Sequence, residues 1–134
     1  MENCHSAKGI WCYEMKYILL VDDDKDYLRL FGNFLQQEGF SVKCAANGDE
    51  ALSILKEFTV HLMITDLNMP NMSGIELAKK ALIIMPFMPV ILHTGDISPE
   101  ISLLSEVVGI SRVLAKPVNP GAMLEAIINE LREI

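Results

Sequence analysis

The fold class is decided by one stretch of sequence, Val60-His61-Leu62-Met63-Ile64-Thr65-Asp66-Leu67-Asn68-Met69-Pro70-Asn71-Met72-Ser73-Gly74. It opens with an apolar run that is too short for a helix and is typical of a strand buried on both faces. Asp66 ends this run, and a loop rich in turn-forming residues follows. In open α/β sheets, sites are built where the strands end. Asp66 is therefore the first candidate for a functional residue.

Strands and helices alternate on both sides of this stretch. Further strands are predicted at residues 17–21, 40–44, 90–93 and 112–115. Helices are predicted at residues 25–38, 49–57, 74–85, 99–108 and from 120 through 131. Strands that alternate with helices through short connections predict a parallel sheet wrapped by helices on both faces. The chain is thus expected to form one doubly wound α/β domain of the (βα)5 type.

Capping residues support these helix boundaries. Asp24 can cap the first helix, and Gly39 follows its end as a left-handed stop. Ser98 precedes Pro99, which is the usual order of an N-cap and a first helical residue. Pro86 stops the third helix, because proline lacks the backbone N–H that a helix interior needs.

The composition fits one domain of 134 residues, of which 51% are hydrophobic. No apolar run approaches the ~18 residues of a membrane-spanning helix, so no contact with a membrane is expected. The net charge of −7 argues against direct binding of nucleic acid, which needs a basic surface. Residues 1–15 show neither a signal-peptide pattern nor periodicity. We expect a poorly ordered tail or linker there, before a domain at residues 16–134.

The three cysteines have no regular spacing, which suits a reducing environment. A cytoplasmic location is therefore expected. Cys44 falls in an apolar, strand-like run, and we expect it to be buried as a small hydrophobic residue.

Polar side chains follow four of the five predicted strands. In chain order they are Asp22 with Asp23, Asp66, Thr94 and Lys116. Where the strand order of a parallel sheet reverses beside the first strand, these four strand ends surround one crevice. Three carboxylates, a hydroxyl and an ammonium are expected to meet there.

These groups fit phosphoryl transfer. Three carboxylates repel one another, and a bound Mg²⁺ would relieve the repulsion because it prefers carboxylate, water and phosphate oxygens. Lys116 can neutralise a further charge, and the Thr94 hydroxyl can donate to a phosphoryl oxygen. Asp66 is then placed as an in-line nucleophile that forms an aspartyl-phosphate.

Each residue also has an ordinary structural explanation. Asp22 to Asp24 can form an acidic turn with a helix cap, Asp66 can cap a turn, and Thr94 can be a turn hydroxyl. A lone Lys116 after a strand carries little information. Their joint occurrence at successive strand ends favours the functional interpretation.

Four motifs carry a resemblance to a known family. They are Leu-Val-Asp22-Asp23-Asp24, Asp66-Leu-Asn-Met-Pro-Asn-Met-Ser-Gly74, His-Thr94-Gly95 and Ala-Lys116-Pro117. From about residue 16 to residue 131, the chain resembles the receiver domain of two-component response regulators, the CheY-like family. Its pattern is most similar to receivers associated with hybrid sensor kinases. The resemblance implies a flavodoxin-like sheet with strand order 2-1-3-4-5. It also implies a regulatory phosphoacceptor, with only its own autophosphorylation and autodephosphorylation chemistry, rather than an enzyme.

The resemblance further implies the roles of the acidic residues. Asp66 would accept a phosphoryl group from a phosphohistidine of a sensor histidine kinase or a histidine phosphotransfer protein. Mg²⁺, for which Mn²⁺ can substitute, would be held by three aspartates and a backbone carbonyl. These ligands would be the side chains of Asp23 and Asp66, Asp22 through water, and the carbonyl of Asn68.

For the remaining motifs, the resemblance implies a switch and a counter-charge. Thr94 would be the switch hydroxyl, and Lys116 would pair with the phosphoryl group. The Lys116–Pro117 peptide bond would be cis. Receivers commonly carry Tyr or Phe three residues before this lysine, as a partner of the switch hydroxyl. Here Val113 stands at that position, which leaves the route of readout open.

The predicted fourth helix, residues 99–108, is apolar on more than one side. This pattern fits an interface with a downstream effector or with a second copy, formed by the fourth helix, the fifth strand and the fifth helix. Deep burial of a short helix fits it equally well.

Two other functions compete with a phosphoacceptor switch. A phosphatase of the haloacid dehalogenase type would use Asp22 as nucleophile and Asp24 as acid, but Lys25 and Asp26 do not fit that family's motif. A receiver-like module that binds partners without phosphorylation is the second alternative. The complete acidic site argues against this module, whereas Val113 gives it weak support.

Overall fold

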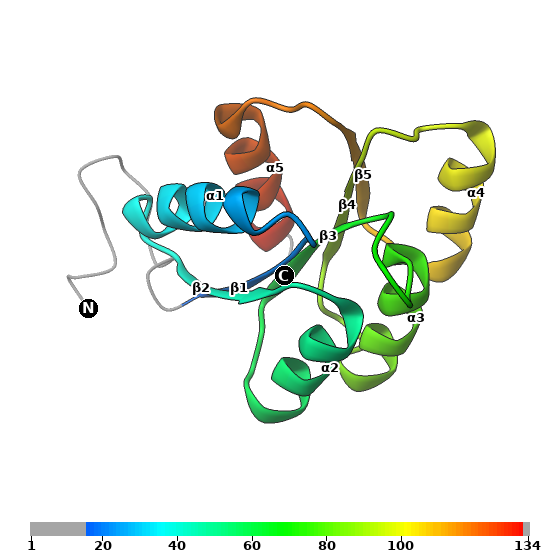
Figure 1. The fold of residues 1–134 in the computed structure, drawn as a ribbon, viewed down its shortest axis with the longest axis horizontal. Coiled ribbons are helices and arrows are strands. Elements are labelled where there is room, and N and C mark those ends of the chain that lie inside the picture. Colours follow the sequence, from blue (N-terminus) through cyan, green and yellow to red (C-terminus); the bar gives the residue numbers. More distant parts are fainter. Residues whose placement is uncertain (1–15, 133–134) are drawn as a thin grey trace.

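A parallel sheet of five strands organises residues 16–132, which are the residues described by this computed structural model (Figure 1). Its strands are β1 (Tyr17–Val21), β2 (Ser41–Ala45), β3 (Leu62–Asp66), β4 (Val90–Thr94) and β5 (Arg112–Ala115). They lie in the order β2-β1-β3-β4-β5, and all pairs are parallel. This order confirms the predicted flavodoxin-like fold. The tail predicted at residues 1–15 lies outside the described residues.

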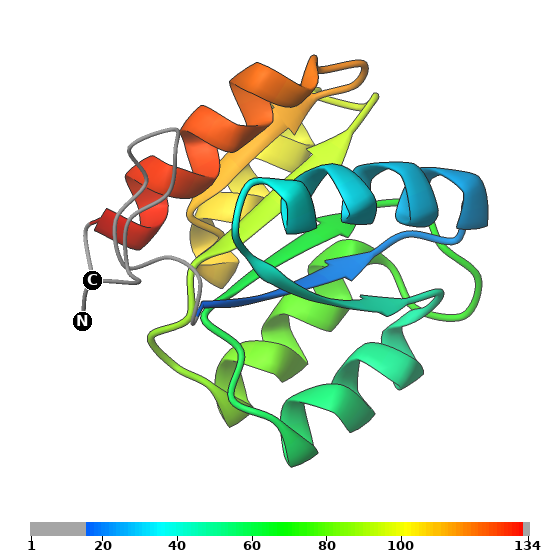
Figure 2. The same ribbon diagram turned by 90° about the vertical axis from the view of Figure 1, so that its left-hand side faces the viewer.

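Helices cover both faces of the sheet. They are α1 (Lys25–Gln37), α2 (Gly48–Glu57), α3 (Gly74–Ile84), α4 (Pro99–Val108) and α5 (Pro120–Arg132). Helices α1 and α5 lie on one face, and α2, α3 and α4 lie on the other (Figures 1 and 2). No helix among residues 16–132 is long and apolar enough to cross a membrane.

The alternation of side chains along the strands divides the core in two. On one face, Ile18 and Leu20 of β1 join a cluster with residues of α1 and α5. On the other face, Leu19 and Val21 join a cluster with residues of α2 and α3. The central strands β1 and β3 are buried on both faces, as the apolar run before Asp66 predicted.

Strand β2 is at the edge of the sheet and is only partly covered. It pairs with β1 alone within the described chain, and its first three residues are half-buried. Cys44 is exposed, so the prediction that it is buried is wrong. The predicted strand also began one residue too early, at Phe40. An apolar run shows that a segment is a strand, but it does not show whether neighbours cover both of its sides.

The predicted caps are confirmed. The Asp24 side chain accepts hydrogen bonds from the backbone N–H groups of Asp26 and Tyr27 at the start of α1. Gly39 follows this helix with φ of 107°, a left-handed conformation that glycine adopts without a Cβ clash. Ser98 caps α4 in the same way as Asp24 caps α1, with Pro99 as the first helical residue. These caps fix where α1 and α4 begin, on the side of the sheet where β1 and β4 end.

Candidate functional site

Three carboxylates meet at the carboxyl edge of the sheet. Strands β1 and β3 are neighbours in register, so Asp22 and Asp66 end up side by side. One oxygen each of Asp22, Asp23 and Asp66 lies within 4.8 Å of the others. Asp22 is buried, Asp66 is half-buried and Asp23 is exposed, so the group faces the solvent from one side only.

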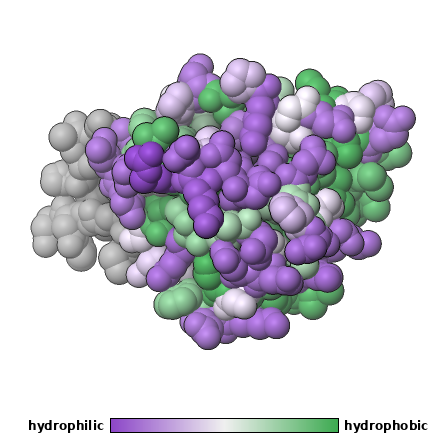
Figure 3. Space-filling view, in the orientation of Figure 1, coloured by the Kyte–Doolittle hydropathy of each residue, from purple (hydrophilic) through white to green (hydrophobic). Residues whose placement is uncertain are grey.

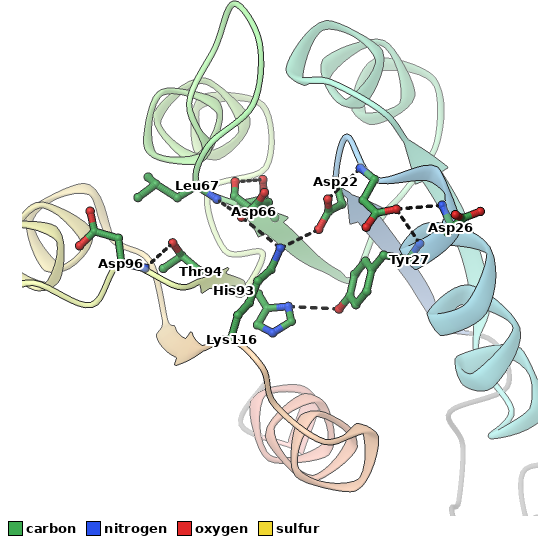
Figure 4. A network of polar contacts seen from close by, with 11 residues as sticks. Asp22, Asp26, Tyr27, Asp66, Leu67, His93, Thr94, Asp96 and Lys116 are labelled. Carbon is green, nitrogen blue, oxygen red and sulfur yellow. Dashed lines mark hydrogen bonds and ion pairs between the residues drawn. The ribbon is translucent and has the colours of Figure 1, made fainter.

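Lys116 reaches this acidic group from the end of β5. Its Nζ lies 3.2 Å from Oδ2 of Asp22 and 3.4 Å from Oδ1 of Asp66 (Figure 4). Burial disfavours the charged form of Lys116, but the Asp22 and Asp66 carboxylates outweigh this effect, and the pKa of Lys116 lies above its ordinary value. The ammonium is therefore charged at neutral pH. The Lys116–Pro117 peptide bond is cis, as the resemblance implied.

The charges of the site fit a divalent cation. Three carboxylates face one ammonium, and backbone amides donate to two of the carboxylates. The amide of Leu67 lies 2.8 Å from Oδ1 of Asp66, and the amide of Asp24 lies 3.0 Å from Oδ1 of Asp22. These bonds orient the oxygens but do not neutralise the charge. A cluster of carboxylate oxygens with one open side suits a hard cation that keeps some of its water ligands.

Thr94 lies at the end of β4, next to the strand that carries Asp66 (Figure 4). Its side chain is fully buried, and Oγ1 accepts a hydrogen bond of 3.0 Å from the amide of Asp96. The amide of Lys116 donates to the carbonyl of Thr94 at 2.8 Å. The ends of β4 and β5 are thus tied together beside the acidic group. Asn68, the predicted carbonyl ligand, is exposed in the loop after β3.

The loop after Asp66 folds back onto the strand end. The amide of Gly74 donates to the carbonyl of Leu67 at 2.8 Å. A Cβ atom at Gly74 would overlap the backbone carbonyl of Asp66, so this close approach requires glycine. Ser73 and Glu76 form a capping box at the start of α3. The loop is therefore pinned at both ends, which fixes the backbone that presents Asp66.

Two residues of the site were missed by the sequence analysis. The Tyr27 hydroxyl on α1 lies 3.1 Å from Nδ1 of His93 on β4 (Figure 4). Lys116 Nζ lies 5.6 Å from the centroid of the Tyr27 ring. The sequence predicted a helix over residues 25–38 and a strand over residues 90–93, and neither Tyr27 nor His93 was given a function of its own there. A polar residue in an otherwise apolar strand, one position before Thr94, was the signal that could have found this pair.

The Tyr27–His93 pair is neutral at physiological pH. Burial and the charge of Lys116 lower the pKa of His93 to about 4, although Asp22 acts in the opposite direction. Burial and the Asp22 and Asp66 carboxylates raise the pKa of Tyr27 well above its ordinary value. With Asp24, Lys116, Pro117 and Val118, the pair lines a hollow of about 240 Å³ beside the acidic group.

This fold and this site define a class of protein: regulatory domains of two-component signalling that accept a phosphoryl group at a strand end. The chain belongs to the response regulator receiver domain family, whose family model matches residues 18–128. Such domains act as regulators rather than as conventional enzymes.

Relatives of known function support this assignment. The transcriptional regulatory protein GlrR of Escherichia coli K12 is 38% identical over 117 residues, which cover 87% of this chain and 26% of GlrR. The chain thus spans about a quarter of that relative. The response regulator receiver protein CpdR of Brucella abortus is 34% identical over 120 residues, which cover 90% of this chain and 97% of CpdR.

Solved structures share the fold closely. A CheY-like receiver domain from Methanospirillum hungatei superimposes with a TM-score of 0.86 at 38% identity, covering 89% of this chain and 95% of that one. A response regulator from Burkholderia pseudomallei, solved with a phosphorylated aspartic acid, a calcium ion and citrate, has a TM-score of 0.81 at 27% identity. This match covers 89% of this chain and 70% of that one.

Proposed function

We propose that Asp66 is the phosphoacceptor and that it takes the phosphoryl group from a phosphohistidine. One observation carries this proposal: of the two carboxylates of the acidic group that contact the Lys116 ammonium, Asp66 is the more accessible, with 13% of its side chain exposed against 3% for Asp22. A carboxylate oxygen of Asp66 would form the new bond to phosphorus while the bond from phosphorus to the donor's imidazole nitrogen breaks. The leaving imidazole would take up a proton from the solvent.

The other site residues would stabilise the charge that moves in this reaction. Mg²⁺, or Mn²⁺ in its place, would neutralise phosphoryl oxygens, with Asp22, Asp23, Asp66 and the Asn68 carbonyl as its protein ligands. Lys116 would turn from the Asp66 carboxylate to a phosphoryl oxygen, and the Thr94 hydroxyl would donate to another. The calcium ion and phosphorylated aspartic acid reported for the Burkholderia pseudomallei relative support this arrangement. Slow autophosphorylation and autodephosphorylation would follow from the same geometry.

The expected partners are a sensor histidine kinase or a histidine phosphotransfer protein, with an effector or a second copy at the face formed by α4, β5 and α5. Three large apolar side chains of α4 support this output face: Leu103, Leu104 and Val107 are 62%, 48% and 75% exposed. Figure 3 shows apolar side chains gathered at the edge of the molecule where α4 lies. Deep burial of this helix, the alternative left open by the sequence, is wrong, since Ser105 is its only buried residue in the described structure. A hybrid-kinase association and a cytoplasmic location stay predictions.

Neither alternative function gains support. In a phosphatase of the haloacid dehalogenase type, Asp24 would have to act as an acid, but its side chain caps α1 through two backbone amides. Asp22 is buried against Lys116 rather than presented to a substrate. A module that needs no phosphorylation would have no use for the carboxylate group.

The decisive test is phosphorylation by acetyl phosphate with Mg²⁺, followed by intact-protein mass spectrometry. The wild type should gain one phosphoryl group, the gain should vanish with EDTA, and Asp66→Asn should show none. Glu57→Gln, which removes an exposed carboxylate from the last residue of α2, at the end of that helix opposite to the site, is the matched control and should behave as the wild type. An equal gain in Asp66→Asn would overturn the assignment of Asp66.

A further inference from the structure

Lys116 has a third neighbour besides its two carboxylates. The Tyr27 ring lies under the ammonium on the α1 side of the site, with 5.6 Å between Nζ and the ring centroid. The face of an aromatic ring attracts a cation at this distance. A lysine ammonium is otherwise a strongly hydrated charge on a flexible stem, and the Lys116 side chain is 32% exposed. The ring therefore limits the positions that Lys116 can take.

The Tyr27 ring is itself held by two contacts, one at its hydroxyl and one at its face. Its hydroxyl is hydrogen-bonded to Nδ1 of His93 at 3.1 Å, and its face stacks on Phe31 with 5.5 Å between ring centroids. His93 is only 4% exposed and belongs to β4, which is paired with β3 on one side and β5 on the other, so its side chain is held in the interior. The backbone amide of Tyr27 is held as well, because it donates to the Asp24 cap at 3.2 Å.

Among the described residues, the only hydrogen bond of the His93 side chain is the one to the Tyr27 hydroxyl. Its second nitrogen, Nε2, is buried without a hydrogen-bond partner among the described residues. A buried, half-satisfied imidazole is costly compared with the aliphatic residues around it on β4.

We propose that Tyr27 is a positioning residue for Lys116 and that His93 acts by holding Tyr27 in place. The pair sets where the ammonium stands when the phosphoryl group arrives at Asp66. This inference rests on the proposed function, in which Lys116 pairs with that group. It assigns a role on the α1 side of the site to two residues that are neither metal ligands nor phosphoryl ligands.

The first measurement needs no phosphorylation. Protons above an aromatic face are shifted upfield in NMR spectra, so the ε-methylene protons of Lys116 should show such a shift in the wild type. The shift should persist in Tyr27→Phe, which keeps the ring, and disappear in Tyr27→Leu. Phe34→Leu, which removes another ring of α1 that stacks on Phe31, is the control and should leave the shift unchanged.

The second measurement is the rate of phosphorylation by acetyl phosphate with Mg²⁺. We expect Tyr27→Leu to be slower by about tenfold, the size of a partly desolvated cation–π contact. Tyr27→Phe should be slower by about threefold, because only the hydrogen bond to His93 is lost. The rate of His93→Leu should equal that of Tyr27→Phe. The double variant that combines Tyr27→Phe with His93→Leu should be no slower than either single variant, because the two residues act as a unit. Phe34→Leu should react at the wild-type rate.

These outcomes separate this inference from the proposed function. If the wild type is phosphorylated at Asp66 and folded Tyr27→Phe and Tyr27→Leu react as fast, the positioning role is wrong and the phosphoacceptor stands. If the wild type is not phosphorylated, the phosphoacceptor is wrong, whatever the NMR shift shows. Loss of folding in Tyr27→Leu leaves Tyr27→Phe and His93→Leu to decide, and wild-type rates in both would overturn the proposal.

Discussion

The two sides of the sheet hold the end of β4 in different ways. On the α1 side, His93 is bonded to Tyr27, and Tyr27 stacks on Phe31. On the α4 side, Thr94 accepts a bond from the Asp96 amide, and Val113 of β5 packs on the apolar cluster of that face as a partly buried residue. Consecutive residues of a strand point to opposite faces, so one strand end serves both sides. On the α1 side the contacts are made by aromatic rings, whereas on the α4 side they are one hydrogen bond from a backbone amide and aliphatic packing.

This comparison suggests how the domain works. In the proposed function, the phosphoryl chemistry requires Asp22, Asp66 and Lys116 at fixed positions, and the proposed role of Tyr27 and His93 would give Lys116 its support on the α1 side. Readout requires an element that can change position at small cost, and the exposed helix α4 is the candidate.

The largest expected difference between the two sides is in stability. Leu35 of α1 is fully buried in the cluster with α5, and Leu35→Ala should lower the free energy of unfolding by about 3 kcal/mol because it leaves a cavity. Urea unfolding followed by circular dichroism measures this loss. A loss of less than about 1 kcal/mol in Leu35→Ala would mean that the core on the α1 side is not packed more closely than the α4 side.

A smaller effect is expected from pH. The pKa of His93 is about 4 in the folded protein and 6.5 in the reference state, so the unfolded chain binds the proton first as the pH falls. Neutral His93 therefore makes its full contribution to the free energy of unfolding above pH 6.5, and this contribution falls steadily as the pH is lowered from 6.5 to about 4. Lowering the pH from 7 to 5 should therefore reduce the free energy of unfolding by about 2 kcal/mol through His93. Urea unfolding at both pH values, in the wild type and in His93→Gln, measures it.

The variant isolates this contribution because other groups remain in both proteins. His61, whose pKa is also lowered by burial and by Lys16, is unchanged by the substitution and contributes to both proteins alike. The same loss of stability between pH 7 and pH 5 in both proteins would show that burial on the α1 side does not suppress protonation of His93.

The smallest effect is expected on the α4 face. Leu104 is 48% exposed, so Leu104→Ser should change the free energy of unfolding by less than about 0.5 kcal/mol. Phosphorylation by acetyl phosphate should be unchanged as well, because Leu104 does not belong to the site. Binding to an effector or self-association, measured by analytical ultracentrifugation of the phosphorylated protein, should be the property that weakens. A loss of stability comparable to that of Leu35→Ala would contradict the comparison.

The sequence predicted the fold and the polar edge of the sheet for one physical reason. Parallel strands bring all their carboxyl ends to the same edge, so residues such as Asp22, Asp66 and Lys116 must meet if the strands are assigned correctly. Five short apolar runs separated by capped helices made that assignment secure. The helix starts at Asp24 and Ser98 followed from local chemistry that needs no distant contact.

Features that depend on which neighbour covers a residue were not predictable in this way. Cys44 lies in an apolar run but on an edge strand, and its exposure depends on the order of strands in space. The contact between Tyr27 and His93 joins residues 66 positions apart and depends on the directions of two side chains. The sequence also left two readings of α4 open, because an apolar helix can be either buried or an interface.

The exposed surface of α4 has a consequence for its amide protons. Its one buried residue in the described structure is Ser105, and Ile101 and Val108 are partly buried on the core cluster, between the caps Ser98 and the left-handed Gly109. A helix with so little buried surface opens locally at a lower free energy than the rest of its domain. In hydrogen-exchange measurements, α4 should therefore lose its protection before α1 and α5. The same low cost of opening would let a binding partner remodel this helix without unfolding the sheet that carries Asp66.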